Sequence, residues 1–327
     1  MDEKKILDVI GFEGIDTTFL EILRDHTAGN PMTEEIKWTD LDKSQISKLF
    51  KDRGYDISEH IVEQLLERHK FKKRQAFKTE TFKDVESRDE QFLKIAELKQ
   101  EFLNSENNPV VSIDVKKKEQ IGNFYRKGKI YTTEKIKVYD HDFASYGEGS
   151  IIPHGIYDLK RNEAYMSIGI SKDTSEFWCD CFRDWWENYG KKQYPYADCI
   201  LAMADGGGSN SSRSYVFKED LQKLANDIGI KIRIAHYPPY TSKYNTIEHK
   251  VFCHVTRACE GVVFSSIEIV KELISKTSTK TGLKVIASIK NKVYQTGRKV
   301  TDLFKEEMEI IFDSILGKWN YVVAPQL

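Results

Sequence analysis

Four short apolar runs rich in β-branched residues constrain the fold of this 327-residue chain more than any other feature of its sequence. They are residues 110–115, 164–170, 199–205 and 230–237. Apolar residues at helical spacing over 174–189 and 215–228 separate the later runs. Strands followed by alternating helices and strands predict an α/β domain with a mixed sheet covered by helices.

The first 80 residues have a different pattern, because their apolar residues follow helical spacing and no alternating strand pattern is visible. One short helix is expected to stop at Gly54, and Asp56 with Glu59 resembles a capping box that opens a second helix. Helix, glycine turn and helix together predict a helix-turn-helix within an all-helical unit.

Further helices are expected from Asp89 to about Leu103, from Ile267 to Lys276 and from Thr301 to Leu316, with a strand, L-K-V-I-A-S-I, between the last two. Turn-forming residues up to Pro109 mark the start of the sheet domain. The predicted parts are a helix-turn-helix DNA-binding domain over 1–80, a linker helix over 81–108, the α/β catalytic domain over 109–300, and a C-terminal helix and tail over 301–327.

The end of the second N-terminal helix carries a basic stretch without acidic residues. Its basic residues are Arg68, Lys70, Lys72, Lys73, Arg74 and Lys78, interleaved with Phe71 and Phe77. Neutralising phosphates with such residues releases counterions, so the stretch suits a DNA backbone, although a solvated helix end and linker is the alternative. The formal net charge of -1 confines any nucleic-acid site to a local patch.

Three acidic residues occupy positions that call for a reason. Asp114 lies within the apolar run V-V-S-I-D-V, where burying an unpaired carboxylate is costly. Asp205 ends the run L-A-M-A before three glycines, at the carboxyl end of a strand, where α/β sheets place their sites. Glu248 opens a helix after the loop H-Y-P-P-Y. Singly, these residues could be an ion pair, a plain loop and a helix-dipole contact. Together they match the way an RNase H-like sheet gathers carboxylates around divalent metal.

Residues near these acids are weaker candidates. Four lysines could position phosphates or could simply be surface residues: Lys116, Lys117, Lys118 and Lys243. Four more polar residues could orient substrate or a carboxylate, or could be structural: Asn210, His236, Asn245 and His249.

Ordered blocks from about Lys37 to about Val300 carry a family resemblance. They include V-S-I-D-V-K-K-K-E-Q-I-G-N-F, A-D-G-G-G-S-N and H-Y-P-P-Y-T-S-K-Y-N-T-I-E-H. The chain resembles the ISAzo-thirteen family of bacterial insertion-sequence transposases of the DDE type. Family members carry a longer N-terminal region with a further helix-turn-helix, and Thr246 stands where a lysine is usual beside the glutamate.

This resemblance implies an RNase H-like fold with Asp114, Asp205 and Glu248 as the DDE triad. It implies two Mg²⁺ ions, which Mn²⁺ can replace, and metal-dependent DNA cleavage at the element's ends followed by strand transfer. The expected partner is DNA, bound by a homodimer, with no membrane and no organic cofactor.

Two other functions remain open at this stage. A catalytically idle or domesticated DNA-binding derivative is favoured by the shortened N-terminus, and another RNase H-like nuclease such as a resolvase is disfavoured by the ordered blocks. Neither an eighteen-residue apolar run nor a signal peptide is visible, so we expect a cytoplasmic protein that is nucleoid-associated when bound.

Overall fold

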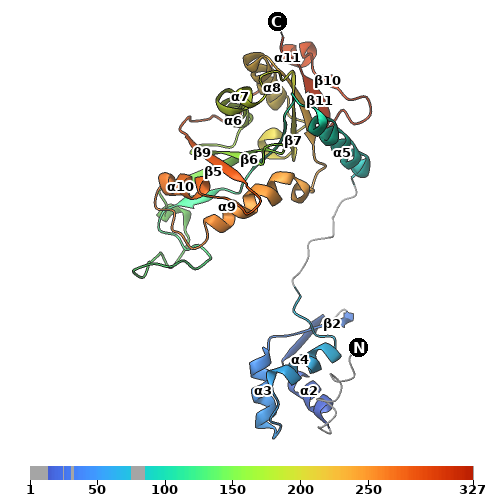
Figure 1. The fold of residues 1–327 in the computed structure, drawn as a ribbon, viewed down its shortest axis with the longest axis vertical. Helices are drawn as coiled ribbons and strands as arrows, with labels where there is room; N and C mark the ends of the chain where they lie inside the picture. Colours follow the sequence, from blue (N-terminus) through green and yellow to red (C-terminus); the bar gives the residue numbers. More distant parts are fainter. Residues whose placement is uncertain (1–13, 25, 31–32, 75–84, 327) are drawn as a thin grey trace. The chain divides into compact units, whose positions relative to one another are not determined.

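A computed structural model describes residues 14–24, 26–30, 33–74 and 85–326. Contacts within the chain divide it into two compact units, residues 1–80 and residues 81–327 (Figure 1). Each unit has its own hydrophobic core.

The described part of the N-terminal unit contains helices and a small antiparallel sheet. Its elements are α2 (Ile15–Arg24), β1 (Thr27–Asn30), β2 (Thr33–Thr39), α3 (Lys43–Asp52) and α4 (Glu59–Arg68). The expectation of an all-helical unit is therefore wrong, since Thr27 pairs with Thr39 across the two strands. The segment T-E-E-I-K-W-T places Ile36 and Trp38 at alternate positions, a period-two pattern too short to stand out among helical segments.

Helices α3 and α4 form the predicted helix, glycine turn and helix. Gly54 adopts a φ of 87°, a left-handed conformation that glycine reaches without steric cost. The predicted capping box at Asp56 is wrong, because Ser58 directly precedes α4 and its side chain accepts from the Ile61 amide. A capping box instead opens α3, where Asp42 and Gln45 bond each other's backbone amides at 2.8 Å.

The second unit is built on a nine-stranded mixed sheet. Its strands are β3 (Val110–Val115), β4 (Glu119–Ile121), β5 (Gly149–Asp158), β6 (Glu163–Gly169), β7 (Cys199–Ala204), β8 (Lys231–His236), β9 (Lys284–Lys290), β10 (Ile311–Phe312) and β11 (Asn320–Val323). The spatial order is β10-β11-β8-β7-β3-β5-β6-β9, with β4 paired to β5. Strands β3, β7 and β8 are parallel, whereas β5 runs antiparallel between β3 and β6. This central order and direction are those of an RNase H-like sheet, which confirms the expected fold.

Helices cover both faces of the sheet (Figure 1). The main ones are α5 (Arg88–Asn104), α6 (Ser175–Trp185), α8 (Tyr215–Ile228), α9 (Cys253–Ala258) and α10 (Ile267–Ser275). Helices α6 and α8 pack on one face through Trp178, Phe182 and Leu221. Helix α5 packs on the other face through Ile95 and Leu98, and α9 and α10 cover the same face further along. The tryptophans of α6, Trp178 and Trp185, are buried in this core.

Shorter helical segments connect these elements. They are the 3₁₀ turns η1 (Ala144–Tyr146), η3 (Gly208–Asn210) and η4 (Ser242–Tyr244), the π-helices η2 (Trp186–Gly190) and η5 (Glu248–Phe252), and the short helices α7 (Lys191–Gln193) and α11 (Asp302–Glu307). Two of them lie at the candidate site, because η3 begins three residues after Asp205 and η5 begins with Glu248.

Two segments that were predicted to lie outside the sheet domain are part of it. The predicted linker helix is α5, and its Gln91 side chain donates to the His236 carbonyl at 2.8 Å and accepts from Asn320 at 2.6 Å. The predicted C-terminal helix, Thr301 to Leu316, is wrong beyond Glu307, because Ile311 and Phe312 form β10, which pairs with β11. The predicted tail contains β11, which pairs with β8 and places Tyr321 and Val323 in the core.

Candidate active site

Asp114 and Asp205 lie side by side at the carboxyl edge of the sheet. Strands β3 and β7 run parallel, and the last pair in their ladder is Ile113 with Ala204. Asp114 and Asp205 are the next residue of each strand, so both carboxylates project from the same edge and the same face. The structure therefore brings together two acids that are distant in the sequence.

Glu248 reaches this edge from the start of the π-helix η5. Burial raises the pKa of the half-buried Glu248, and the Asp205 charge raises it further, against His249 and Lys116. Burial also raises the pKa of Asp114 to about 7, with added repulsion from Asp205 and Glu248. Asp114 is only 8% exposed. The three predicted triad residues thus share one electrostatic site with an excess of negative charge.

A buried pair, Ser112 and Asn245, fixes the segment that carries Glu248 to strand β3. The Asn245 amide donates to the Ile113 carbonyl at 2.9 Å and to Asp114 Oδ2 at 3.3 Å. The Ser112 hydroxyl donates to Asn245 Oδ1 at 2.5 Å and accepts from the Ile247 amide at 2.9 Å. The chain one residue before Glu248 is therefore bonded to the strand that presents Asp114.

Ser112 is a site residue that the sequence reasoning missed, although Asn245 was a candidate. Its signal is a hydroxyl two residues before Asp114 in an otherwise apolar strand, which places both on one face. A buried serine needs a hydrogen-bond partner, so its position carried information.

The glycine-rich turn after Asp205 holds that carboxylate through backbone and side-chain donors. Gly207 donates its amide to Asp205 Oδ1 at 3.1 Å. The buried Asn210 amide donates to the same oxygen at 3.3 Å when its nitrogen faces the carboxylate. Gly206 has a φ of 69°, and a Cβ there would lie 3.1 Å from His236 Nδ1, so a glycine suits this position in two ways.

A fourth carboxylate, Asp173, faces the same cleft. This cleft has a volume of about 280 Å³ and is lined by Asp114, Asp205, Asp173 and Lys118, among others. Burial raises the pKa of Asp173; a hydrogen bond from Ser209 and the Lys118 charge oppose this, and Asp205 adds repulsion. Sequence reasoning missed Asp173, because an aspartate before the α6 cap at Thr174 looks like ordinary helix-start chemistry.

The predicted phosphate-binding lysines differ in their availability. Lys117 and Lys118 are exposed and line the cleft, whereas Lys116 is bonded to Glu119 at 2.7 Å. Lys243 lies over the Tyr244 ring at 5.1 Å, and its carbonyl is bonded by the His249 ring. His249 therefore holds the loop before Glu248.

His236 does not face the carboxylates. It pairs with Ala204 across β7 and β8, so its ring lies on the face covered by α8. The ring is fully buried against Phe217 and Tyr321, and burial lowers its pKa to about 3. This candidate is a neutral core histidine bonded to the Tyr321 hydroxyl at 2.9 Å.

Only some residues of the N-terminal basic stretch are available to contact DNA. Arg68 forms an ion pair with Asp16 at 2.5 Å, and Phe71 packs against the helical core. Lys70, Lys72, Lys73 and Arg74 are exposed. Lys78 and Phe77 lie outside the described residues.

The donor set fits a hard divalent cation. Asp114, Asp205 and Glu248 offer only carboxylate oxygens, the ligands Mg²⁺ prefers, and their mutual repulsion is what a cation would relieve. Within the described ranges, no three His, Cys, Asp or Glu side chains are already gathered closely enough to hold one metal ion.

Acidic residues so placed on an RNase H-like sheet are typical of DDE-type transposases. The family model described as the Rhodopirellula transposase DDE domain matches residues 18–325, and the chain belongs to this family. The match confirms the resemblance noted from the sequence blocks.

The chain is also similar, at low sequence identity, to solved structures of the Mos1 transposase. A paired-end complex with the left transposon end shares 13% identity at a TM-score of 0.43, covering 79% of this chain and 68% of that chain. A paired end complex with Mg shares 12% identity at a TM-score of 0.44, with 79% and 68% coverage. No curated protein sequence matches the chain. In the described part of the chain, none of the helices is both long and apolar enough to span a membrane.

Proposed function

We propose that this transposase cleaves DNA at the ends of its insertion sequence and joins those ends to target DNA. The observation that carries the proposal is the register that sets Asp114 beside Asp205, with Glu248 bonded into the same edge through Asn245 and Ser112. Family membership supports the reaction class.

Two Mg²⁺ ions, for which Mn²⁺ can substitute, would be held by the three carboxylates. By analogy with the fold class, Asp114 would contact both ions, and Asp205 and Glu248 would each hold one. When bound, the ions lower the pKa of an attacking water and stabilise the leaving 3′ oxygen. The Gly207 amide and the Asn210 side chain orient the Asp205 carboxylate throughout.

The reaction has two displacements at phosphorus. In the first, a water oxygen bonds to the scissile phosphorus and the bond to the 3′ oxygen breaks, which leaves a 3′-hydroxyl. In the second, that hydroxyl attacks a target phosphate and displaces another 3′ oxygen. Lys117 and Lys118 at the cleft mouth contact the phosphates flanking the reacting one.

DNA binding by the N-terminal unit completes the proposal. Lys70, Lys72, Lys73 and Arg74 are exposed after the helix-turn-helix and contact backbone phosphates. Each lost phosphate contact is expected to reduce the slope of log affinity against log salt by about 0.9. Two ends must be held at once, so the functional species on DNA is a homodimer.

The experiment is cleavage and joining of a labelled DNA fragment that carries the element's own ends, with Mg²⁺ or Mn²⁺. Native protein is compared with Asp205→Asn and with the matched control Asp198→Asn. Asp198 precedes the first residue of the same strand, at the opposite edge of the sheet, where it bonds Asn108 at 2.7 Å.

Metal-dependent nicking that is lost in Asp205→Asn and retained in Asp198→Asn supports the proposal. Native protein that binds the ends and never cuts them contradicts it and leaves a DNA-binding derivative as the function. Cutting that survives in Asp205→Asn contradicts the assignment of the triad.

A further inference from the structure

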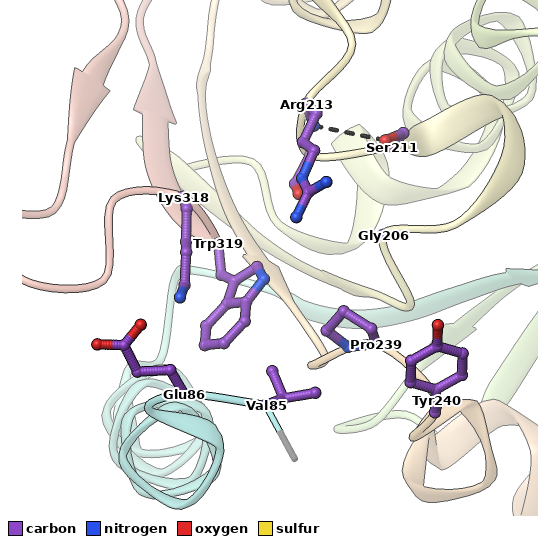
Figure 2. A pocket seen from close by; sticks show the side chains of 10 residues that line it. Val85, Glu86, Gly206, Ser211, Arg213, Pro239, Tyr240, Lys318 and Trp319 are labelled. Atoms are coloured by element: carbon purple, nitrogen blue, oxygen red, sulfur yellow. Dashed lines mark hydrogen bonds between the residues drawn. The ribbon is translucent and has the colours of Figure 1, made fainter. Parts of the chain in front are cut away.

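A second cavity opens directly beside the candidate active site. It has a volume of about 560 Å³, within the range of sites that bury a small organic ligand. Gly206, the residue after Asp205, lines it together with Arg213, Pro239, Tyr240, Lys318 and Trp319 (Figure 2). Asp205 follows β7 and Tyr240 follows the parallel strand β8, so the cavity lies along the same carboxyl edge of the sheet.

The charges around this cavity favour an anion. Arg213 and Lys318 are both exposed, and neither forms an ion pair with any residue that the structure describes. Figure 2 shows the Arg213 side chain directed into the cavity. Glu86 is the one acidic residue in the lining, so the cations outnumber it. A guanidinium and an ammonium on one rim are the donors that phosphate oxygens take up.

The aromatic residues around this cavity favour a ligand with a flat ring. Tyr240 is 68% exposed although its ring is apolar, and its φ of 64° is uncommon outside glycine. The loop is fixed in this conformation, because the buried Thr241 hydroxyl donates to the Pro238 carbonyl at 2.6 Å. Trp319 lies across the cavity with the Lys318 ammonium 4.2 Å from its ring centre. An exposed aromatic ring held in place is a stacking surface for a base.

We propose that this cavity binds an unpaired nucleotide of the DNA strand next to the scissile phosphate. Tyr240 stacks on its base, and Arg213 with Lys318 contacts its phosphate. The nucleotide is unpaired because both faces of a base inside a duplex are covered by its neighbours, so a side chain can stack only on a base that has left the stack. Gly206 adjoins Asp205, so the cavity starts within one residue of the carboxylates.

The inference rests on the proposed function, and its test is therefore a binding measurement made in EDTA, without cleavage. The probe is a precleaved fragment carrying the element's ends, with either a base or an abasic residue at each nucleotide flanking the cleaved phosphate. Fluorescence anisotropy gives the affinity of native protein, Tyr240→Ala and Tyr240→Phe. Tyr196→Ala is the matched control, since Tyr196 is 79% exposed and lies before β7, at the other edge of the sheet.

The expected result is a coupling between Tyr240 and one base. Tyr240→Ala weakens binding of the intact probe about 5- to 100-fold and leaves unchanged the affinity for the probe that is abasic at the pocket position. Tyr240→Phe keeps the ring and binds as native protein does, and Tyr196→Ala changes nothing. Arg213→Gln and Lys318→Gln each lower the salt slope by about 0.7 to 0.9.

Equal weakening of intact and abasic probes at every position by Tyr240→Ala overturns the proposal, as does no weakening at all. A parallel cleavage reaction with Mg²⁺ separates the two claims. Protein that cleaves without this coupling retains the proposed function and loses the nucleotide pocket. Protein that shows the coupling without cleaving retains the pocket and loses the proposed function.

Discussion

The acidic residues on the two faces of the central sheet differ in whether a cation is bonded to them. On the face of Asp114, repulsion from neighbouring acids raises the pKa of Asp114 and of Glu248, and Lys116, the cation beside them, is bonded to Glu119. On the face of α6 and α8, the buried acids Asp220 and Asp180 are paired with cations. Arg298 bonds both oxygens of Asp220 at 2.8 and 2.9 Å, and Lys292 bonds Asp180 at 2.8 Å.

Proton affinities follow the same division. Burial acts to raise the pKa of Asp180, but hydrogen bonds from Lys292 and Arg183 hold it below its usual value. Burial raises the pKa of Asp114 to about 7, and repulsion from Asp205 and Glu248 adds to this against hydrogen bonds from the Val115 amide and Asn245. The difference separates a network that stabilises the fold from a site that is kept short of positive charge.

The largest effect is expected from a substitution of Asp114, on the face where neighbouring acids repel one another. Asp114→Asn is expected to lower the rate of end cleavage by about 1,000-fold or more, because a metal-binding carboxylate is lost. The same change is expected to raise the free energy of unfolding by about 1 to 3 kcal/mol at pH 8 in EDTA, because a repelled charge is removed. Cleavage assays and chemical denaturation measure the two effects, and a destabilised Asp114→Asn would remove the contrast between the faces.

A smaller loss of activity is expected when hydrogen bonds that position the segment before Glu248 are removed. Asn245→Ala removes the bonds from this side chain to the Ile113 carbonyl and to Asp114, and it is expected to reduce cleavage about 10- to 100-fold, the usual cost of losing an outer partner of a metal ligand. The positioning role predicts that more Mg²⁺ is needed for half-maximal rate. A fall in the rate at saturating Mg²⁺ with an unchanged metal requirement would show that Asn245 does not act through the ligands.

Substitutions on the paired face, the one covered by α6 and α8, are expected to change stability and not activity. Arg298→Ala leaves the buried Asp220 without its cation and is expected to reduce the free energy of unfolding by about 2 to 4 kcal/mol. Lys223→Ala removes a surface contact with Glu219 at 3.3 Å and serves as the control, with a cost under about 1 kcal/mol. Cleavage per folded molecule is expected to stay at the native level, and a specific loss there would tie this network to the site.

The smallest effect concerns His154, a fully buried histidine on the paired face. Burial lowers its pKa to about 3, below the usual 6.5, so the unfolded chain binds the proton more tightly between these values. Stability is therefore expected to fall as pH drops through this range, by up to about 1.4 kcal/mol per pH unit from this residue. His154→Leu should reduce the slope of stability against pH by that amount. An unchanged slope in denaturation from pH 7 to 4.5 would contradict its burial in neutral form.

Sequence reasoning located the features that are local in the chain. An aspartate in an apolar run and another at the end of a run identify Asp114 and Asp205 without knowledge of the sheet, because each conflicts with its own surroundings. Glu248 was identified by the resemblance and by its helix start. Strands β3, β6, β7 and β8 follow from their apolar, β-branched composition in the same way, whereas the central strand β5 was not predicted.

The features that were missed depend on pairing over long distances. Nothing near Ser112 indicates that its hydroxyl bonds Asn245, and Asp173 gains its meaning only where the fold sets it beside Asp205. The direction in which His236 points depends on its register with Ala204. Strand β11 lies in the segment predicted only as a tail, because its four residues give too short a pattern without β8 beside it.

Strand β11 has a consequence for how the protein is made. It is the neighbour of β8 in the sheet, yet residues 237–319 are synthesised between them. Until residue 323 has left the ribosome, β8 presents a row of unpaired amides and carbonyls, and Gln91 lacks Asn320. An open edge of this kind is where nascent chains aggregate, so the yield of folded protein will depend on how quickly the last strand arrives.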